Sequence, residues 1–354
     1  MTLIKVKSRG TDNVSGRRNL AINGAMQIAQ RGTITGIGAS NATVYTACDR
    51  FNIYTTSSAG RLTASQEAVT DLGGFPNALK LQCTTADTSV AAGELFILGQ
   101  RFEGQAVQGI EKGYSTAKEV TVSFYAKANE SRVHVCEIYD TDNTRQCSKA
   151  FTVTTSWQRF SLTFPADTTG KFNDDNGLSL NLMWHLHSGS NLTSGTLNSS
   201  AFASATDANR AVGIGSIVAS TNNNFFITGV QVEIGSSASD FEHRSFGEEL
   251  SLCQRYYFDL NFATVNGTAA RNHWLYAIAE NNSAAGYRRS TITLPTTMRD
   301  VPTITATIDH TGGSSGVDGG NWTGASSVSL YVNSIGNNDS GYAYTSAFVA
   351  SSEL

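Results

Sequence analysis

One short loop near the end of the chain has the residue types of a sugar-binding site. Trp322 follows Asn321, and Asp318 lies slightly earlier, within a glycine-rich run from Thr311 to Gly324. An indole ring stacks on the apolar face of a sugar, while amide and carboxylate groups hydrogen-bond to its hydroxyls. These three residues are therefore the candidate glycan-binding site. The alternative is that Trp322 packs under its own loop or in a subunit interface.

Neighbouring acidic residues invite comparison with glycosidases, whose two catalytic carboxylates stand roughly 5 to 9.5 Å apart. The neighbouring acids are Asp174 with Asp175, Glu248 with Glu249, and Asp140 with Asp142. Acids are common in exposed loops, and Glu248 also fits a helix-capping position. We therefore expect no catalytic residue and no enzyme activity.

His185 and His187 alternate along a predicted strand and point to the same side of it. A zinc site needs further donors, and the sequence nearby offers no third ligand. The opposite side of this strand carries an apolar stripe that should face a core: Leu180, Leu182, Trp184 and Leu186. The histidines should therefore lie on the outer side of the sheet. No metal and no cofactor is expected, since nucleotide-binding and zinc-protease motifs are also absent from the sequence.

The five cysteines are odd in number and widely spaced, which predicts free, mostly buried thiols rather than a disulfide framework. Cys136 and Cys147 are the exception. A hairpin turning about Thr141 and Asp142 would set them opposite each other, close enough to bridge. Whether they form a disulfide stays open, because assembly in a cytosol would leave them reduced.

The elements that position these residues are short strands. Glu119–Lys127 and Arg132–Tyr139 alternate between apolar and polar residues, as half-buried strands do. Roughly eight or nine such runs without a convincing helix predict a jelly-roll-like antiparallel β-sandwich over residues 19–247. Trp157 and Trp274 should lie in cores. The loop from Ser188 to Asn209 is expected to be a mobile excursion or to pack on a neighbouring subunit.

The ends of this sandwich are predicted separately. Residues 1–18 form an arm, either a disordered tail or a virion-attachment segment that orders on a partner. Arg17–Gly32 predicts a first strand broken by Gly24. Ser245 and Glu248 fit a capping box that begins one short helix, with an apolar stripe of Phe246, Leu250, Cys253 and Tyr257. Residues 248–354 then form a smaller antiparallel β domain led by this helix.

Composition excludes several classes of partner. The 354 residues carry a net charge of -4 and only 15% charged residues, without a basic stripe. Nucleic acid is therefore not expected as a partner. No apolar run approaches the roughly 18 residues of a membrane span, so no membrane insertion is expected.

Several stretches of the chain resemble one protein family. They are Arg18-Asn-Leu-Ala-Ile-Asn-Gly-Ala-Met-Gln-Ile-Ala-Gln-Arg-Gly32, Cys48-Asp-Arg-Phe51, Gln231-Val-Glu-Ile-Gly235, Asp240-Phe-Glu-His-Arg244, Glu248-Glu-Leu-Ser-Leu-Cys-Gln-Arg-Tyr-Tyr257 and Leu294-Pro-Thr-Thr-Met-Arg-Asp-Val-Pro-Thr303. They are similar to bacteriophage virion-surface proteins, mostly labelled tail-fibre or tail-fibre-like. The resemblance implies a jelly-roll or carbohydrate-module-like sandwich, a homotrimer and a place on the virion.

We therefore interpret the chain as a non-enzymatic phage virion surface protein, assembled in the host cytoplasm. The favoured role is a tail fibre or fibre-like component that contacts host-surface glycan, with the arm attached to other virion proteins. One alternative is a capsid or tail decoration with a purely structural role. A second is a virion-associated glycan-degrading enzyme. An exposed aromatic groove favours recognition, a buried Trp322 favours decoration, and two convergent carboxylates favour an enzyme.

Overall fold

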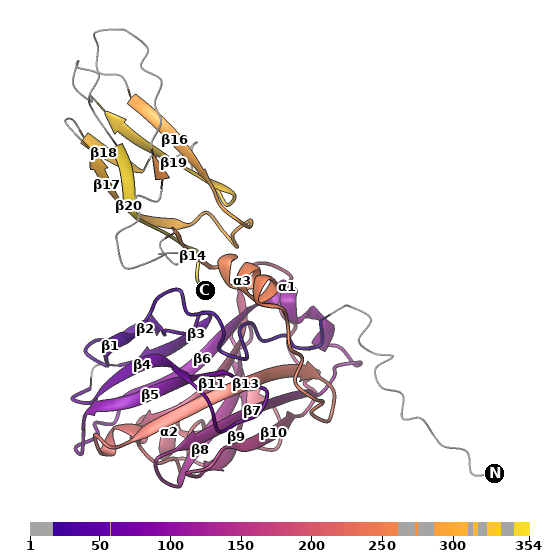
Figure 1. Cartoon of the computed structure of the whole chain (residues 1–354). Helices are drawn as coiled ribbons and strands as arrows, with labels where there is room; N and C mark the ends of the chain where they lie inside the picture. Colours follow the sequence, from indigo (N-terminus) through magenta and orange to yellow (C-terminus); the bar gives the residue numbers. More distant parts are fainter. Residues whose placement is uncertain are drawn as a thin grey trace. The chain divides into compact units, whose positions relative to one another are not determined.

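The computed structural model describes residues 17–56, 58–260, 273–274, 287–310, 314–317, 324–333 and 343–354. The chain divides into two compact units, Met1–Arg244 and Ser245–Leu354 (Figure 1). The expected arm therefore lies outside the described residues, except for Arg17 and Arg18.

The first unit is a sandwich of two antiparallel sheets. The first sheet, sheet A, has the order β1-β4-β5-β13-β7-β10, and the second, sheet B, has the order β12-β9-β8-β11-β6-β3-β2. The strands of sheet A are β1 (Ile34–Ile37), β4 (Arg61–Ala68), β5 (Asn77–Thr85), β13 (Asn224–Ile234), β7 (Val120–Ala128) and β10 (Gln158–Phe164). Those of sheet B are β12 (Ala203–Ser204), β9 (Arg145–Val153), β8 (Arg132–Asp140), β11 (Leu178–Ser188), β6 (Leu95–Glu103), β3 (Phe51–Thr55) and β2 (Ala42–Tyr45). The predicted all-β sandwich is confirmed.

Aromatic rings from the two sheets meet in the core. Phe124 of β7 packs edge-on against Trp184 of β11, with ring centroids 5.5 Å apart, and against Phe151 of β9 at 5.1 Å. The alternation in β7 explains this arrangement, because every second residue from Val120 to Ala128 is buried in the same core cluster. The predicted inward stripe of β11, from Leu180 to Leu186, is confirmed in that cluster.

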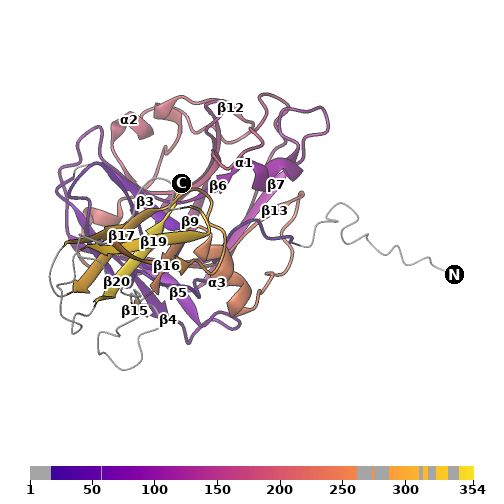
Figure 2. The same cartoon turned by 90° about the horizontal axis from the view of Figure 1, so that it is seen from above.

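The outer face of sheet B is covered by residues 189–219, here called the cover segment. It contains the short helices α2 (Ser190–Thr193), η2 (Asp207–Asn209) and η3 (Ile217–Ala219), and the edge strand β12. Leu192 and Ala211 are buried against Leu95, Ile97 and Met183 of the sheet. Seen from above, α2 and β12 lie along one side of the unit, and β4 and β5 lie along the other (Figure 2). Ser188–Asn209 is therefore no excursion away from the body, because Leu192 packs it on its own sheet. Packing of this segment on a neighbouring subunit stays a prediction.

The start of the folded chain also differs from its prediction. Residues 17–32 contain no strand, although Ala21, Met26 and Ile28 are buried. Asn23 and Met26 have φ angles of 59° and 55°, which a strand does not permit. The even spacing of apolar residues here reflects an irregular segment that packs on the sandwich.

A short connection after β6 holds α1 (Gly104–Val107) and η1 (Gln108–Ile110).

The register of the β8–β9 hairpin separates the two cysteines. Asp140 pairs with Arg145, so Ile138 lies opposite Cys147 and Lys149 lies opposite Cys136. Both thiols are free and buried. The expected opposition of Cys136 and Cys147 is wrong because the hairpin turns through four residues, one of them Thr144 with a φ of 52°. Burial raises the pKa of the Cys147 thiol to about 11, as expected for an unreactive thiol.

The second unit begins with helix α3 (Phe246–Gln254), capped by the Ser245 hydroxyl, which accepts the amide of Glu248 at 3.3 Å. The helix buries Glu249 and Cys253, whereas Phe246 is 52% exposed, so the predicted apolar stripe is only partly right. The following strands are β14 (Tyr257–Asp259), β15 (His273–Trp274), β16 (Tyr287–Thr293), β17 (Thr303–His310), β18 (Ser314–Val317), β19 (Ser327–Asn333) and β20 (Ala343–Ser351). They form two antiparallel sheets, one centred on β20 and one with the order β16-β19-β18. Phe348, Leu330 and Ile292 belong to its core.

Candidate functional site

The candidate sugar-binding loop cannot be placed. Trp322, Asn321 and Asp318 lie outside the described residues, so the hypothesis of a stacking site there stays a prediction. The side chain of Trp274 also lies outside them.

All of the paired acids except the exposed Asp174 lie in structural contacts or in a helix turn. Asp140 is fully buried, and Lys112 Nζ lies 2.5 Å from its Oδ2 and 3.2 Å from Asp167 Oδ2. Asp142 Oδ2 accepts the amide of Asn173 at 3.0 Å, and Asp175 Oδ1 accepts that of Gly177 at 2.8 Å. Glu248 and Glu249 lie in the first turn of α3, where negative charge favours the helix dipole.

The two histidines of β11 point outward, as expected, but they are buried because the cover segment closes that face. His185 Nε2 lies 2.7 Å from Glu137 Oε2, and Arg210 of the cover segment donates to both Glu137 oxygens at 2.9 and 3.0 Å. Burial alone would raise the pKa of Glu137, but Arg210 and His185 hold it below its ordinary value. His187 bonds to the Ser216 hydroxyl at 2.8 Å. This cluster fastens the cover segment to sheet B.

In the described part of the chain, no group of three or more His, Cys, Asp or Glu side chains is placed to hold a metal ion. None of its helices has the length and apolar character needed to cross a bilayer.

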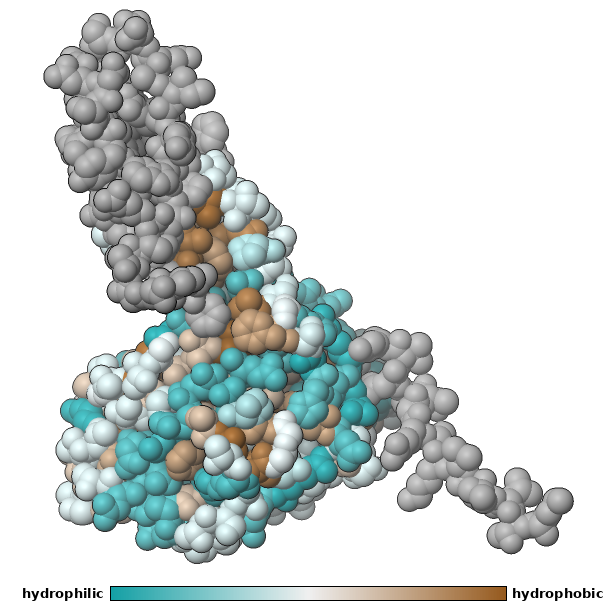
Figure 3. Space-filling view, in the orientation of Figure 1, coloured by the Kyte–Doolittle hydropathy of each residue, from teal (hydrophilic) through white to brown (hydrophobic). Residues whose placement is uncertain are grey.

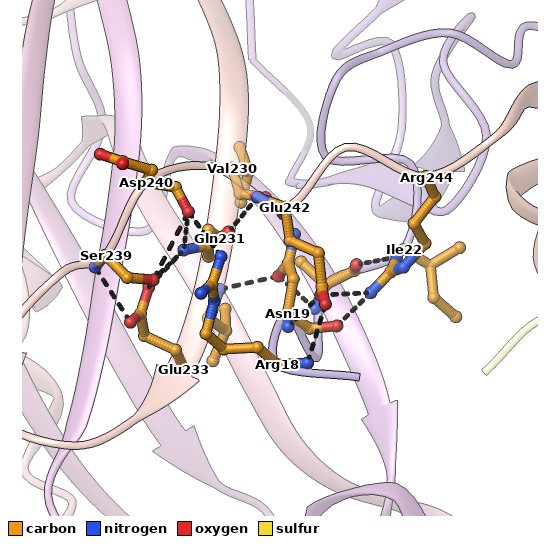
Figure 4. A network of polar contacts seen from close by, with 12 residues as sticks. Arg18, Asn19, Ile22, Val230, Gln231, Glu233, Ser239, Asp240, Glu242 and Arg244 are labelled. Atoms are coloured by element: carbon orange, nitrogen blue, oxygen red, sulfur yellow. Dashed lines mark hydrogen bonds and ion pairs between the residues drawn. The ribbon is translucent and has the colours of Figure 1, made fainter. Parts of the chain in front are cut away.

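Part of the outer face of sheet A lies under residues 235–244, here called the strap (Figure 4). Ser239 donates its amide to Glu233 Oε1 at 3.0 Å, and Glu242 donates its amide to Gln231 Oε1 at 2.8 Å. Both acceptors are outward-facing residues of β13, and both are buried. The strap therefore covers the end of β13 and hydrogen-bonds to the buried polar side chains there.

The strap also fixes the first folded residues of the chain. Glu242 accepts the backbone amides of Arg18 and Asn19 at 3.2 and 2.6 Å. Asn19 Oδ1 in turn accepts the amide of Val232 at 3.0 Å, and Arg244 donates to the carbonyl of Ala21 at 2.9 Å. Two motifs that are far apart in the sequence, Arg18–Gly32 and Asp240–Arg244, thus meet beside β13 (Figure 4).

The rest of the outer face of sheet A carries four side chains in line across the strands, here called the aromatic–lysine row: Lys80, Phe226, Lys127 and Trp157. Phe226 of β13 pairs with Lys80 of β5 on one side and with Lys127 of β7 on the other. Both ammonium groups lie over the Phe226 ring, at 5.6 and 5.4 Å from its centroid. Lys127 also lies 4.8 Å from the Trp157 ring centroid. All four side chains are partly exposed.

Trp157 is held in a fixed orientation. Its Nε1 donates to Asp71 Oδ1 at 2.9 Å, and Lys127 Nζ donates to Asp71 Oδ2 at 2.6 Å. These two hydrogen bonds hold the pKa of Asp71 below its usual value. The ring stands nearly perpendicular to Phe226, at 74° and a centroid distance of 6.3 Å. The expectation that Trp157 lies in a core is wrong, because it precedes β10 on the outward side of the sheet.

Between the row and the strap lies a second aromatic group. Phe75 packs against Tyr125 at 5.2 Å, against Phe241 of the strap at 5.0 Å and against His243 at 5.4 Å. Gly229 makes room for it: its φ is 61°, and a Cβ there would lie 2.9 Å from both Phe75 and Tyr125. The rings of Phe75 and Phe241 thus pack the strap against β13 at this bulge.

This face can bind a flat, partly apolar ligand. Partly exposed rings supply stacking surfaces, and Lys80, Lys127 and Asp71 supply hydrogen-bonding groups beside them. Figure 3 shows hydrophobic residues set singly or in small groups among hydrophilic ones on the visible surface of the first unit, the lower body. Sequence alternation marks Phe226 and Lys127 as outward residues, but only the strand register shows that they are neighbours.

No family model matches the chain, and no curated protein matches it. Among solved structures, it resembles one described as CBM4, with 12% identity, 60% of this chain and 97% of that chain covered, and a TM-score of 0.32. It also resembles the CBM22-1 xylan-binding domain of Xyn10C from Paenibacillus barcinonensis, with 10% identity, 63% and 100% covered, and a TM-score of 0.31.

A third similar structure is the enzymatically active domain of tailspike protein 4 from bacteriophage CBA120. The identity is 10%, the coverage is 61% of this chain and 21% of that chain, and the TM-score is 0.32. Similarities of this size decide neither the function nor the ligand of this chain.

Proposed function

We propose that the chain is a non-enzymatic glycan-binding protein of a phage virion surface, a tail fibre or fibre-like component that contacts host-surface glycan. The observation that carries the glycan part is the aromatic–lysine row. The virion part rests on the sequence resemblance. Its motifs at Arg18–Gly32 and Asp240–Arg244 make the hydrogen bonds between the strap and the first folded residues, here called the clamp.

The row has the features of a sugar platform. Trp157 and Phe226 offer two nearly perpendicular rings, so one can lie under a sugar while the other borders it. Asp71 fixes Trp157 before any ligand arrives, which lowers the entropy lost on binding. The face is open rather than a deep pocket, and this suits a chain of sugars bound along a surface. Several copies, as in a homotrimer, would multiply a weak contact.

The acidic residues support a role without catalysis. Asp140 is committed to Lys112, and Asp142 to Asn173. A capsid or tail decoration protein and a glycan-degrading enzyme are the alternatives. The decoration role needs no ligand, and the enzyme would shorten its glycan.

The test is binding of the full chain to an array of bacterial surface polysaccharides. Trp157→Ala and Phe226→Ala should each weaken binding at least about tenfold, about 1.4 kcal/mol. Tyr114→Ala is the matched control, because Tyr114 is 47% exposed and has Lys171 Nζ 4.0 Å from its ring centroid, yet lies outside the row. If no polysaccharide binds, or if all three variants behave alike, the proposal is wrong. New reducing ends during incubation would favour the enzyme.

A further inference from the structure

We infer that the glycan bound by the aromatic–lysine row is acidic, a polysaccharide whose sugars carry carboxylates. This inference rests on the proposed function and names the ligand class of the same site. It is carried by the two ammonium groups that flank Phe226.

The first step concerns Lys80. Its side chain is 27% exposed, and its Nζ lies 4.0 Å from Glu67 Oε1, beyond hydrogen-bonding distance. Glu67 Oε1 instead accepts the hydroxyl of Ser65 at 2.9 Å. The three N–H donors of Lys80 can therefore turn to an incoming anion without breaking a short ion pair.

The second step concerns position. Lys80 and Lys127 belong to the two strands on either side of β13, and both ammonium groups lie over the Phe226 ring, so a sugar that reaches this ring meets two ammonium groups. Lys127 is tied to Asp71 at 2.6 Å and keeps its place. A carboxylate on that sugar reaches Lys80 and forms a charge-assisted hydrogen bond, which is stronger than a bond to a neutral hydroxyl.

The third step concerns the balance of charge. The chain as a whole has a net charge of -4. Around the row, Lys80 and Lys127 stand beside Glu67 and Asp71, while Arg159 of β10 turns to the strap and donates to the carbonyl of Ser239. Asp71 is held by Lys127 and Trp157, so the Lys80 ammonium is the charged group of the row that an acidic polymer meets.

Single-stranded nucleic acid also stacks on aromatic rings beside cations. The row is a poor fit for it, because the carboxylates of Asp71 and Glu67 are 58% and 43% exposed and would face a continuous run of phosphates. Carboxylates spaced along a polysaccharide can avoid them.

The experiment compares matched polymers on the full-length protein. Polygalacturonate, alginate, hyaluronan and polysialic acid are each titrated beside their carboxyl-reduced, neutral forms, at low and at physiological salt. The variants are Lys80→Gln, Trp157→Ala and the control Lys118→Gln, which removes an equal charge from a lysine paired with Glu111 outside the row. Oligo-dT is titrated as well.

We expect at least one acidic polymer to bind about tenfold more tightly than its reduced form. Lys80→Gln should lower that affinity about three- to tenfold and reduce its salt dependence, while leaving the neutral form within about twofold. Lys118→Gln should change neither, and Trp157→Ala should weaken both.

Equal binding of acidic and reduced polymers, lost in Trp157→Ala, overturns the acidic ligand and leaves the proposed function standing. If no polymer of either form binds, both ideas fail. Tighter binding of oligo-dT than of any polysaccharide also overturns both.

Discussion

The carboxylate of Glu242 accepts the backbone amide of Asn19 at 2.6 Å and so joins the strap, which follows the last strand of the sandwich, to the first folded residues. The same carboxylate accepts the amide of Arg18 at 3.2 Å. Backbone amides that lose such an acceptor in a buried place are costly. Arg18, Asn19 and Glu242 belong to no strand, so hydrogen bonds from a side chain take the place of a backbone ladder here.

Glu242→Gln should therefore destabilise the first unit by about 1–2 kcal/mol. An amide oxygen is a weaker acceptor than a carboxylate oxygen, and glutamine has one acceptor oxygen where glutamate has two. Urea unfolding followed by tryptophan fluorescence measures the change. Glu119→Gln, at an exposed glutamate of the same unit, should lie within about 0.5 kcal/mol of wild type. Equal effects of the two changes would refute the role given to Glu242.

Arg210→Met should cost about 3 kcal/mol or more, because it leaves the buried Glu137 charge with His185 alone. Adding Glu137→Gln to Arg210→Met should recover part of the loss, since the buried charge is then gone. Hydrogen exchange of the amides in residues 189–219 should quicken in Arg210→Met before exchange in β7 does. Uniform protection across both regions would contradict a local role for the ion cluster.

Stability should fall between pH 7 and pH 5. Burial lowers the pKa of His187 to about 4 and that of His134 to about 3, so both stay neutral while the unfolded chain takes up protons below about pH 6.5. The unfolded state then binds more protons, and each histidine costs about 2 kcal/mol at pH 5. His187→Gln should flatten this pH dependence by about that amount in urea titrations at the two pH values. Glu94, whose pKa is raised by burial, acts in the opposite sense, so Glu94→Gln should steepen it.

Asp71→Ala should weaken glycan binding about three- to tenfold while changing the free energy of unfolding by less than about 1 kcal/mol. The reason is that Asp71 is exposed but orients both Trp157 and Lys127. Affinity by calorimetry and unfolding in urea separate the two effects. Asp174→Ala removes another exposed carboxylate and should alter neither quantity; a loss of binding there would point to a general charge effect.

Gly229→Ala should destabilise the first unit by about 2–4 kcal/mol, since the new methyl meets Phe75 and Tyr125 at 2.9 Å in addition to the strain of a positive φ. Gly213 has a φ of 84°, and a methyl added there would meet nothing within 4 Å, so Gly213→Ala isolates the strain at about 1 kcal/mol. Thermal or urea unfolding measures the loss of unfolding free energy in each variant, and the difference between the two losses is the cost of the clash. No difference would mean that the rings yield without cost.

The sequence predicts what depends on local alternation and misses what depends on register. The inward stripe around Trp184 follows from period two alone, and it is confirmed. The pairing of Cys136 with Cys147 depends on the length of the turn between them, which alternation does not reveal, and two residues of register move them apart. Lys80, Phe226 and Lys127 come from three strands that are distant in sequence, so no local pattern makes them neighbours.

Burial by loops is harder to predict than burial by strands. The segment after Ser188 reads as polar, yet Arg210 supplies the partner for Glu137 and Leu192 fills the apolar gap. Trp157 precedes a strand, and only the orientation of β10 shows that it points outward. The site around Trp322 remains a prediction, since those residues lie outside the described part of the chain.

The clamp between the strap and the first folded residues has a mechanical consequence. Tension applied at Arg17 and at Arg244 is borne first by the hydrogen bonds of Glu242 and Arg244 and by the bond from Leu20 N to Val232 O at 2.8 Å. These bonds must break before the pull reaches the strands of the sandwich. When the first unit is stretched between these two points, the clamp therefore bears the force and the aromatic–lysine row is not distorted.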